Sequence, residues 1–549
     1  MLIPHRTMNR AKKGFILLLL FCTACAISCR KGSGPSWDTQ ILAPLIKTSL
    51  SINNLVTNTS LKTNPADSSV TLVYTDSLYS LNLDSLLKLR DTTLSYQYPS
   101  LVGGKIPPGG AIPFPASTGP TQYNTGNVQL TNAIVSSGYV KLEVTSYLSQ
   151  PTDYTYSVPS ATLFGAPLNI TVKVPAASGS TPASDSTLYD LSGYVIDFTG
   201  PMHNGNNQFS TQIIGTVDPA ADTLVTVTLP NGLIIRATFI NIIPYYGQGY
   251  FGQTKKSIGP KQTNFPLFSK ISSGSLNLKN VSVNFTLENG LGVDARIVIP
   301  QLLSINSHPG GQTIPLSGNI INNAININRA TQTYNPASPV NPSIQAYSLN
   351  PGNSNILQWI DNLPTSIGYT IDLTTDPLGN VSGNTDFAFL GHGIKAYLDV
   401  SVPLYIAANN LTLADTMPVN FANSAQAEQI KSGTFTLYAS NLFPFSAGLQ
   451  IYLLDSHMHI TDSLCTSSQT IAAGAENTYG FVTTPQNSVL TIPVSTTQAN
   501  HLFTTRNIII TARFNTGCTT CIPVQFSKIY DTYLLNIKLV GNFDYQVKG

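Results

Sequence analysis

Charged side chains are scarce in this chain of 549 residues. They make up 10% of the composition, against ~25% in an ordinary soluble protein. Basic and acidic residues nearly balance, 28 against 26, for a formal net charge of +2. This balance excludes the broad basic surface of a nucleic-acid-binding protein and also a polyacidic tail. Apolar residues make up 42%, which excludes wholesale disorder, and the length fits about three or four domains.

The motifs of common enzyme classes are absent. The sequence contains no Gly-x-Ser-x-Gly elbow, no His-Glu-x-x-His and no phosphate-binding loop. Its histidines and glutamates are few and scattered, so no nucleophile and base can be paired from spacing. We therefore predict a non-enzymatic protein that needs no cofactor.

Long apolar runs are also missing, since none reaches the ~20 residues that a membrane-spanning helix requires. The longest run extends from Phe15 to Cys22 and continues, with interruptions, to Ile27. Four basic residues precede it: Arg6, Arg10, Lys12 and Lys13. This order of a basic segment and a short apolar core is typical of a signal peptide.

The end of this segment resembles a bacterial lipobox. In Ala26-Ile27-Ser28-Cys29, small residues precede a cysteine that would be lipidated and become the mature N-terminus. We predict a signal peptide over residues 1–28 and acylation of Cys29, with palmitate-type chains, and Cys25 is the alternative lipidation site. Ordinary secretory cleavage without lipidation stays open.

A lipid anchor would make electrostatic attachment to the membrane unnecessary. Removal of residues 1–28 takes away four basic and no acidic residues and leaves a net charge of −2. Several acyl chains hold a protein on a bilayer through ~0.8 kcal/mol per buried methylene. We therefore expect a cell-envelope protein, lipid-anchored to the outer membrane on its periplasmic or its surface face.

Hydrophobic alternation with period two dominates the body of the chain. Apolar residues occupy every second position from Ile394 to Ile406, and similar alternation covers 281–287 and 533–539. Helical periodicity is confined to short stretches at 81–90 and 353–362. The pattern predicts an all-β fold of tandem β-sandwich-like domains, and the alternative is an elongated barrel or tube of the lipid-binding type.

Composition shifts suggest where domains end. We expect a tether and first β segment over 29–102, a Pro/Gly-rich linker over 103–120, and one or two β units over 121–334 that divide near 244–266. A second linker over 335–352 would precede a C-terminal β domain over 353–549. A Ser-Gly-x-apolar-x-Leu pattern recurs at 137–142, 273–278 and 432–437, which indicates either one similar hairpin per domain or chance similarity of strands.

The chain resembles a known group of proteins in four features. These are the lipobox-like start, Pro35-Ser36-Trp37-Asp38, Gly249-Tyr250-Phe251-Gly252-Gln253 and a strand-Asn-x-x-Pro-strand unit at Asn441. Together they are similar to long β-rich lipoproteins of Bacteroidetes envelopes, over most of the mature chain. The resemblance implies an envelope location and brings no known activity. The last unit is also similar to sandwich domains of late-embryogenesis-abundant and tubular lipid-binding proteins, by analogy only.

Cys518 and Cys521 form the sharpest chemical motif, Cys-x-x-Cys. A redox site needs a helix N-terminus to stabilise the thiolate, whereas this motif lies between predicted strands. Structural zinc needs four ligands, and Cys465 is the only other thiol in the body. We predict a local disulfide, which suits an oxidising envelope, with redox, metal and free-thiol states as alternatives.

Three weaker candidates remain. His457 and His459 would share one face of a strand and could hold a metal, but no third ligand is placed, so a solvated hairpin end is favoured. An oxygen-rich loop holds Asp372, Asp376, Asn380, Asn384 and Asp386 and could bind calcium, although turn chemistry explains it better. Trp359 could stack on a sugar, although a core position is commoner.

These observations predict an envelope lipoprotein with a binding or structural role. The membrane would be its partner through the N-terminal lipid, nucleic acid is not expected, and a protein, glycan or lipid partner is unidentified. A surface glycan-binding module and an envelope lipid carrier are the alternatives.

Overall fold

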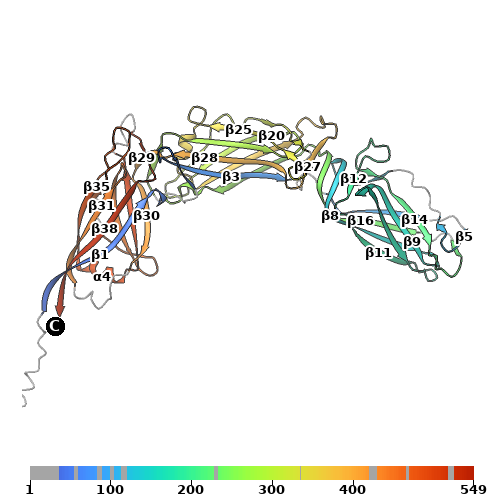
Figure 1. The fold of residues 1–549 in the computed structure, drawn as a ribbon, viewed down its shortest axis with the longest axis horizontal. Helices are drawn as coiled ribbons and strands as arrows, with labels where there is room; N and C mark the ends of the chain where they lie inside the picture. The colour runs from blue at the N-terminus through green and yellow to red at the C-terminus, as the bar shows by residue number, and fades with distance from the viewer. Residues whose placement is uncertain are drawn as a thin grey trace, which may run out of the picture.

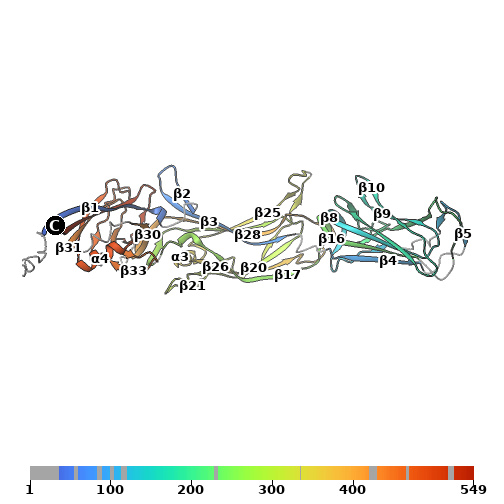
Figure 2. The same cartoon turned by 90° about the horizontal axis from the view of Figure 1, so that it is seen from below.

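Three β-sandwich modules follow one another along the molecule. The computed structural model describes residues 36–54, 60–82, 89–98, 104–112, 120–227, 233–271, 273–333, 335–419, 430–464, 469–516 and 525–548. The modules form an arch in one view and a nearly straight rod in the view turned by 90° (Figures 1 and 2). Within the described ranges we name them the proximal module (36–54 and 411–548), the middle module (60–82 and 251–409) and the distal module (89–250).

The proximal module contains both described ends of the chain. Its elements are β1 (Ser36–Ser51), η1 (Ile52–Asn54), β30 (Leu411–Pro418), β31 (Ile430–Asn441), β32 (Ser446–Leu454), β33 (Ile460–Ser463), β34 (Thr470–Ile471), β35 (Gln486–Val494), α4 (Thr496–Thr504), β36 (Asn507–Asn515) and β38 (Leu534–Lys548). One sheet has the order β1-β38-β31-β35, and the other has the order β30-β36-β32-β33 with β34 also on β32.

The middle module is built from two distant stretches of the chain. Its elements are β2 (Leu61–Thr63), β3 (Val70–Asn82), β17 (Lys255–Asn264), η3 (Pro266–Phe268), β18 (Ser275–Leu278), β19 (Ser282–Asn289), β20 (Ala295–Ile305), β21 (Thr313–Pro315), β22 (Ile325–Ile327), β23 (Thr331–Gln332), β24 (Val340–Asn341), β25 (Ser343–Leu349), α3 (Ile356–Asp361), β26 (Ser366–Thr375), β27 (Asp386–Phe389), β28 (Gly393–Pro403) and β29 (Tyr405–Asn409). Its sheets are β2-β3-β28-β19-β25 and β17-β26-β20-β21, with β22 also on β20. A small sheet, β18-β29-β37, adds β37 (Ser527–Lys528) and joins this module to the proximal one.

The distal module is formed by one continuous stretch of chain. Its strands are β4 (Thr92–Tyr98), β5 (Gly104–Ile106), β6 (Ala111–Ile112), β7 (Thr121–Gln122), β8 (Gln129–Ser146), β9 (Thr152–Leu163), β10 (Ala166–Val174), β11 (Ala183–Asp190), β12 (Val195–Asp197), β13 (Gln208–Phe209), β14 (Gln212–Val217), β15 (Val225–Val227) and β16 (Leu233–Tyr250). One layer runs β4-β16-β8-β11 and the other β6-β14-β9-β10, and β12 pairs with both β8 and β9 where the layers meet.

The three modules share one strand order. The layers β1-β38-β31-β35, β3-β28-β19-β25 and β4-β16-β8-β11 correspond strand by strand along the chain, and so do the opposite layers. Each insertion occupies the same place, because the middle module lies between β1 and β30, and the distal module lies between β3 and β17. The chain is therefore a nested series of one repeated sandwich.

An equivalent turn in each module supports this repeat. The side-chain oxygens of Asn289, Asn441 and Ser146, all buried, accept hydrogen bonds from the backbone N–H two residues later, at 3.0, 2.9 and 3.3 Å. In the two asparagine turns, Nδ2 also donates to two backbone carbonyls. The Ser-Gly patterns at 137–142 and 432–437 lie on the equivalent strands β8 and β31, whereas the pattern at 273–278 lies at β18 and not at the equivalent β19.

The prediction of an all-β sandwich-like fold with few, short helices is confirmed. Side chains of β28 alternate between buried and half-buried positions, as the sequence predicted for 394–406, and α3 lies inside the helix expected at 353–362. The described sheets keep open edges, so they do not close into the elongated barrel that was the alternative. The helix expected at 81–90 lies mostly outside the described residues, and β3 extends through Asn82.

The sheets cross the boundaries that composition suggested. The described part of 29–102 contributes β1 to the proximal, β3 to the middle and β4 to the distal module. The expected linker 335–352 contains β25, which pairs with β19 along Ser343–Leu349, and the expected linker 103–120 contains β5 and β6. Proline and glycine are tolerated there because these are short or edge strands with an unpaired side. β16 ends at Tyr250 and β17 begins at Lys255, within the segment 244–266.

Candidate functional site

Several residues with strong sequence signals lie outside the described ranges. These are the signal peptide 1–28, the lipidation candidates Cys29 and Cys25, and the predicted disulfide partners Cys518 and Cys521. Lipidation and the disulfide therefore stay predictions. In the described ranges, no helix has both the length and the apolar character needed to cross a membrane.

Trp359 does not form a binding platform. It lies in α3 and is fully buried, at 0% exposure. A sugar needs an exposed ring face to stack on, whereas Trp359 lies in the core, the position that is commoner for tryptophan. Hydrophobic neighbours on both sides of Trp359, Ile356 and Ile360, are buried with it.

His457 and His459 lie in an exposed turn between β32 and β33, and not along one strand face. Asp455 organises this turn, since its Oδ1 accepts the backbone N–H groups of both histidines at 2.8 and 2.9 Å. The imidazole rings stack with centroids 6.2 Å apart. Within the described part of the chain, no group of three or more histidine, cysteine, aspartate or glutamate side chains is arranged so that it could hold a metal ion.

Two other histidines, His501 and His203, pair with aspartates, and no described hydroxyl bonds the Nε2 atom of either ring. The Nδ1 atom of His501 lies 2.8 Å from Asp462 Oδ2, and that of His203 lies 3.1 Å from Asp197 Oδ2. Thr199 also contacts His203 through Nδ1, at 3.2 Å. A hydrolytic triad needs the hydroxyl on the opposite ring nitrogen, Nε2, so neither pair has that geometry.

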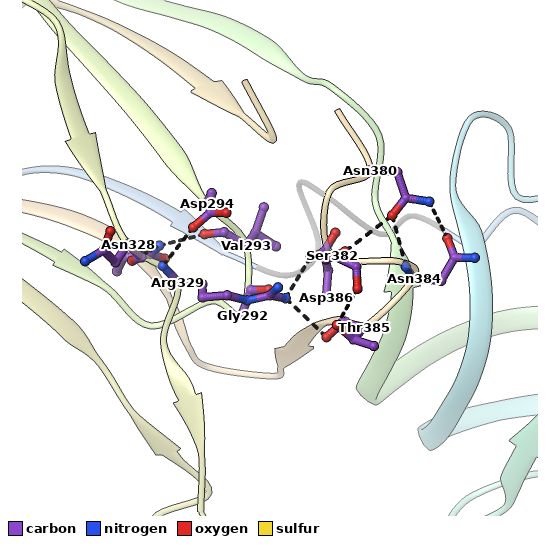
Figure 3. Close-up of polar contacts among 11 residues, drawn as sticks. Gly292, Val293, Asp294, Asn328, Arg329, Asn380, Ser382, Asn384, Thr385 and Asp386 are labelled. Carbon is purple, nitrogen blue, oxygen red and sulfur yellow. Dashed lines mark hydrogen bonds and ion pairs between the residues drawn. The ribbon is translucent and has the colours of Figure 1, made fainter. Parts of the chain in front are cut away.

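The oxygen-rich loop after β26 is held by its own side chains. Asn380 Oδ1 accepts the backbone N–H of Asn384 at 3.0 Å, and Asn380 Nδ2 donates to Asn384 Oδ1 at 2.7 Å. Thr385 Oγ1 donates to the carbonyl of Ser382 at 2.8 Å. These contacts (Figure 3) are the turn chemistry that the sequence favoured, and they occupy the amide oxygens that a cation would otherwise use.

Arg329 is the centre of a polar cluster beside this loop. One of its guanidinium nitrogens, Nη2, donates to Asp386 Oδ1 at 2.7 Å, to the carbonyl of Thr385 at 3.1 Å and to the carbonyl of Gly292. The backbone N–H of Arg329 also donates to Asp294 Oδ1, at 3.2 Å. Figure 3 shows how these bonds bring the turn between β19 and β20, the segment after β22 and the start of β27 together.

β27 connects this cluster to the distal module. It pairs antiparallel with β16, with Asp386 opposite Gly249 and Phe389 opposite Tyr246. Phe389 also packs against the rings of Tyr246 and Tyr245, at centroid distances of 4.7 and 5.7 Å. Arg329 therefore fastens the strand that carries the contact between the middle and distal modules.

Asp376 and Asp386 are buried carboxyl groups in this region. They are 4% and 1% exposed, and the Oδ2 atom of each has no hydrogen-bond partner among the described residues. Burial, together with the neighbouring Asp386 and Asp294 carboxylates, raises the pKa of Asp376 to about 7 despite the opposing charge of Arg329. Burial also raises the pKa of Asp386, while its contacts with Ser382 and Arg329 counteract the rise.

An open cleft of about 280 Å³ adjoins Asp376. It lies beside the ends of β20, β22 and β26, and its lining contains both polar and apolar residues: Asp294, Ala295, Arg296, Asn326, Ile327, Asn328, Asp376, Pro377, Leu378, Gly379 and Val381. The backbone N–H of Asp376 donates to the carbonyl of Asp294 at 2.8 Å, so these two aspartates are neighbours across the strands. This cleft with its carboxyl groups is the candidate functional site.

Sequence reasoning found only part of this site. It selected Asp376 and Asp386 through the oxygen-rich loop, but it missed Asp294 and Arg329, which lie in connecting segments elsewhere in the chain and carry no local motif. One signal was available: Asp294 follows the Asn289 turn directly, as Ser446 follows the Asn441 turn. A charged residue at that point in a chain with so few charges is unusual.

The distal module contains an apolar cavity, but a very small one. It measures about 20 Å³ among Tyr123, Phe198, Phe209 and Phe239 and their aliphatic neighbours. That is close to the space of one water molecule. An acyl chain needs far more room, so this cavity does not favour the lipid-carrier alternative.

The chain is similar to several solved structures only at low scores. A "putative secreted protein" from Parabacteroides distasonis ATCC 8503 aligns with 92% of this chain and 99% of its own at 9% identity, with a TM-score of 0.27. The infectious bursal disease virus Gx strain structure aligns with 90% of this chain and 86% of its own at 11% identity, with a TM-score of 0.11. Scores this low carry no argument about function. No family model and no curated protein matches the chain.

Proposed function

We propose that this protein is a lipid-anchored, non-enzymatic display rod of the cell envelope, which presents its distal module to a binding partner. The observation that carries the proposal is the pairing of β1 with β38, in which Ser36 lies opposite Lys548. This pairing brings both described chain ends to the proximal module, at the opposite end of the rod from β5 and β11 (Figure 1). Cys29 precedes β1 by a few residues, so a lipid there would attach the proximal end.

The distribution of exposed apolar side chains supports a binding role for the distal module. Among the described residues, nine large apolar side chains are exposed on the distal module, against three on the middle and five on the proximal module. Phe164, in the turn between β9 and β10, is 101% exposed. Exposed apolar side chains mark a contact surface where they are contiguous, and the proposal takes the distal module as that surface.

The attachment can be tested with the natural protein. Mass analysis of the mature chain is expected to show an acylated Cys29, and Cys29→Ser is expected to release the protein from membranes into the aqueous fraction. Cys25→Ser serves as the matched control and is expected to leave attachment unchanged. An unmodified amino end, or release by the control alone, contradicts the predicted anchor.

The orientation needs a separate measurement. Lipidated protein is placed in vesicles that contain a lipid-bound quencher, with Cys465, Cys518 and Cys521 replaced by serine. A fluorophore is then attached at Thr497→Cys, on the exposed start of α4, or at Phe164→Cys in the distal module. We expect strong quenching at position 497 and weak quenching at 164. Equal quenching at the two positions would contradict the display arrangement.

A further inference from the structure

The sheet β2-β3-β28-β19-β25 of the middle module ends at an open edge. Among the described strands, only β19 pairs with β25, so the backbone groups on the other side of β25 have no strand partner there. Near the end of β25, Asn353 Nδ2 donates to the carbonyl of Ser348 at 2.9 Å. β25 lies on the convex side of the arch (Figure 1), so the bent ends of the rod leave it accessible. An unpaired edge of this kind is a template for pairing with another chain.

The other long strands at sheet ends carry features that usually block such pairing, namely charges, proline or polar outward side chains. β17 contains three lysines and a proline, β11 contains two aspartates, and β1, β10 and β30 contain at least one charged residue each. β35 contains Pro493, and its Thr491 carbonyl accepts a hydrogen bond from Gln469 at 3.1 Å. The exposed side chains of β4 are all polar. The sequence of β25, Ser-Ile-Gln-Ala-Tyr-Ser-Leu, contains neither a charge nor a proline.

The outward side chains of β25 are apolar or small. Ile344 is 61% exposed, and it shares the outer face of the strand with Ala346 and Ser348, which are also exposed. On β19, Glu288 lies opposite Ile344 and is paired with Lys395 at 3.8 Å. The edge therefore presents an apolar side chain, and the charge on the strand next to it is already neutralised.

We propose that the open edge of β25 is a docking surface for a second copy of this chain, whose own β25 pairs with it antiparallel. Two identical strands that pair in this way are related by a twofold axis and form a self-complementary interface. With Ala346 on the axis, all seven residues of the strand are paired: Ile344 lies opposite Ser348 of the second copy, and Gln345 lies opposite Tyr347 of the second copy. Because β25 carries no charge, the pairing brings no like charges together, which would destabilise it.

The size of this contact predicts a transient dimer. A strand of seven residues paired with its copy falls short of the ~1,600 Å² that a standard stable complex buries. Association in dilute solution is therefore weak. Many copies attached to one surface would strengthen it, since linked weak contacts add up to a higher avidity.

The symmetry of the pair has a consequence for anchored chains. The strands of the middle module run along the rod (Figures 1 and 2), so an antiparallel pair of β25 strands places the two rods in opposite directions. The two proximal modules then lie at opposite ends of the dimer. This step rests on the proposed function: if each proximal module carries a lipid, the two paired copies are attached to two facing membranes.

The docking surface is tested first in solution, with the full mature chain carrying Cys29→Ser so that lipid plays no part. Sedimentation at about 5 to 300 µM protein is expected to show a reversible monomer–dimer equilibrium, since small interfaces associate weakly. Ala346→Lys places two ammonium groups at the twofold axis and is expected to weaken dimerisation at least tenfold. Val489→Lys is the matched control, because Val489 is also 61% exposed, on the edge strand β35. This control is expected to dimerise like the wild type.

Crosslinking locates the axis without adding a charge. In the same chain, with Cys465, Cys518 and Cys521 replaced by serine, Ala346→Cys is expected to form a disulfide-linked dimer under mild oxidation. A residue on the axis faces its own copy, within the Cα separation of about 4.4–6.8 Å that a disulfide spans. Val489→Cys is expected to stay monomeric.

Three results would overturn the β25 contact. These are a wild type that stays monomeric over the whole concentration range, a dimer that Ala346→Lys does not weaken, and crosslinking at Val489→Cys as fast as at Ala346→Cys. A wild type that stays monomeric because its β25 edge accepts a strand of some other protein belongs to the first case.

The facing-membrane arrangement needs its own measurement. Vesicles that carry the lipidated wild type or lipidated Val489→Lys are expected to cluster, and vesicles that carry lipidated Ala346→Lys are expected to stay dispersed. Dimers in solution without clustering of vesicles would contradict the anchored arrangement and leave the β25 contact standing. Absence of dimers in solution would overturn the β25 contact whether or not the chain is lipidated.

Discussion

Replacing the buried asparagine of the repeated turn with alanine should destabilise the module that contains it. Asn289→Ala removes three hydrogen bonds: 2.8 Å to the carbonyl of Val293, 2.9 Å to that of Asn328, and 3.0 Å from the N–H of Leu291. Asn289 is 0% exposed, so its former partners stay buried and unpaired. Each unpaired group costs ~1–3 kcal/mol, and the surroundings relax in part, so we expect the free energy of unfolding of the middle module to fall by about 3–5 kcal/mol.

The third module supplies a graded comparison. Ser146→Ala removes one hydrogen bond from the N–H of Leu148, at 3.3 Å, and a contact of 3.0 Å with the Tyr154 hydroxyl. The longer bond and the smaller side chain predict a loss of about 1 kcal/mol. Asn441 makes three equivalent hydrogen bonds. Asn441→Ala should therefore lower the free energy of unfolding by the same amount, but in the proximal module.

Tryptophan fluorescence can localise the effect. In a Trp37→Phe background, Trp359 is the remaining tryptophan and is buried in the middle module. In urea, Asn289→Ala is expected to lower the Trp359 midpoint strongly, and Ser146→Ala much less. If Asn289→Ala and Ser146→Ala shifted this midpoint equally and slightly, the hydrogen bonds of the Asn289 turn would not stabilise the middle module.

Three further predictions concern pH, the module contact and the thiols. The stability that Asp376 contributes should be lost as pH rises from 3.8 to about 7, because the pKa of Asp376 is higher in the folded than in the unfolded chain. The loss is worth up to ~4 kcal/mol. In urea unfolding at pH 5 and pH 8, the free energy of unfolding of Asp376→Asn should therefore decline less than that of the wild type. Phe389→Ala should loosen the contact with Tyr246 and widen the range of overall dimensions in small-angle scattering, while Tyr438→Ala, at an exposed proximal position, should not. Thiol titration of the oxidised mature protein, denatured without reductant, should find one free thiol, Cys465, and three free thiols would contradict the Cys518–Cys521 disulfide.

Period-two patterns predicted the strands well because they follow directly from burial. In β28, the residues from Ile394 to Val402 that the sequence placed inward are buried, at 0–2% exposure. Pro403 is the last residue of β28, and the ladder to β19 has already ended at Ser401. Its missing N–H therefore costs no hydrogen bond on that side.

The nesting of the modules could not be read from the sequence, because it depends on pairing between distant segments. β1 pairs with β38 across almost the whole chain, and local composition carries no record of that partner. The candidate site could not be predicted in full for the same reason. Asp294, Arg329 and Asp376 come from three separate parts of the middle module, and only the shared turn at Asn289 and Asn441 left a visible trace.

The nested insertion sets an order in which the modules can be completed as the chain emerges from its amino end. When the chain emerges from its amino end, β1 appears first but must wait for β38, which is the last strand to appear. The distal module has all its own strands once residue 250 has emerged, and the middle sandwich follows after residue 403. Assembly would therefore begin with the distal module and finish with the proximal module, so a chain truncated within β38 would retain a folded distal module on an unfinished proximal one.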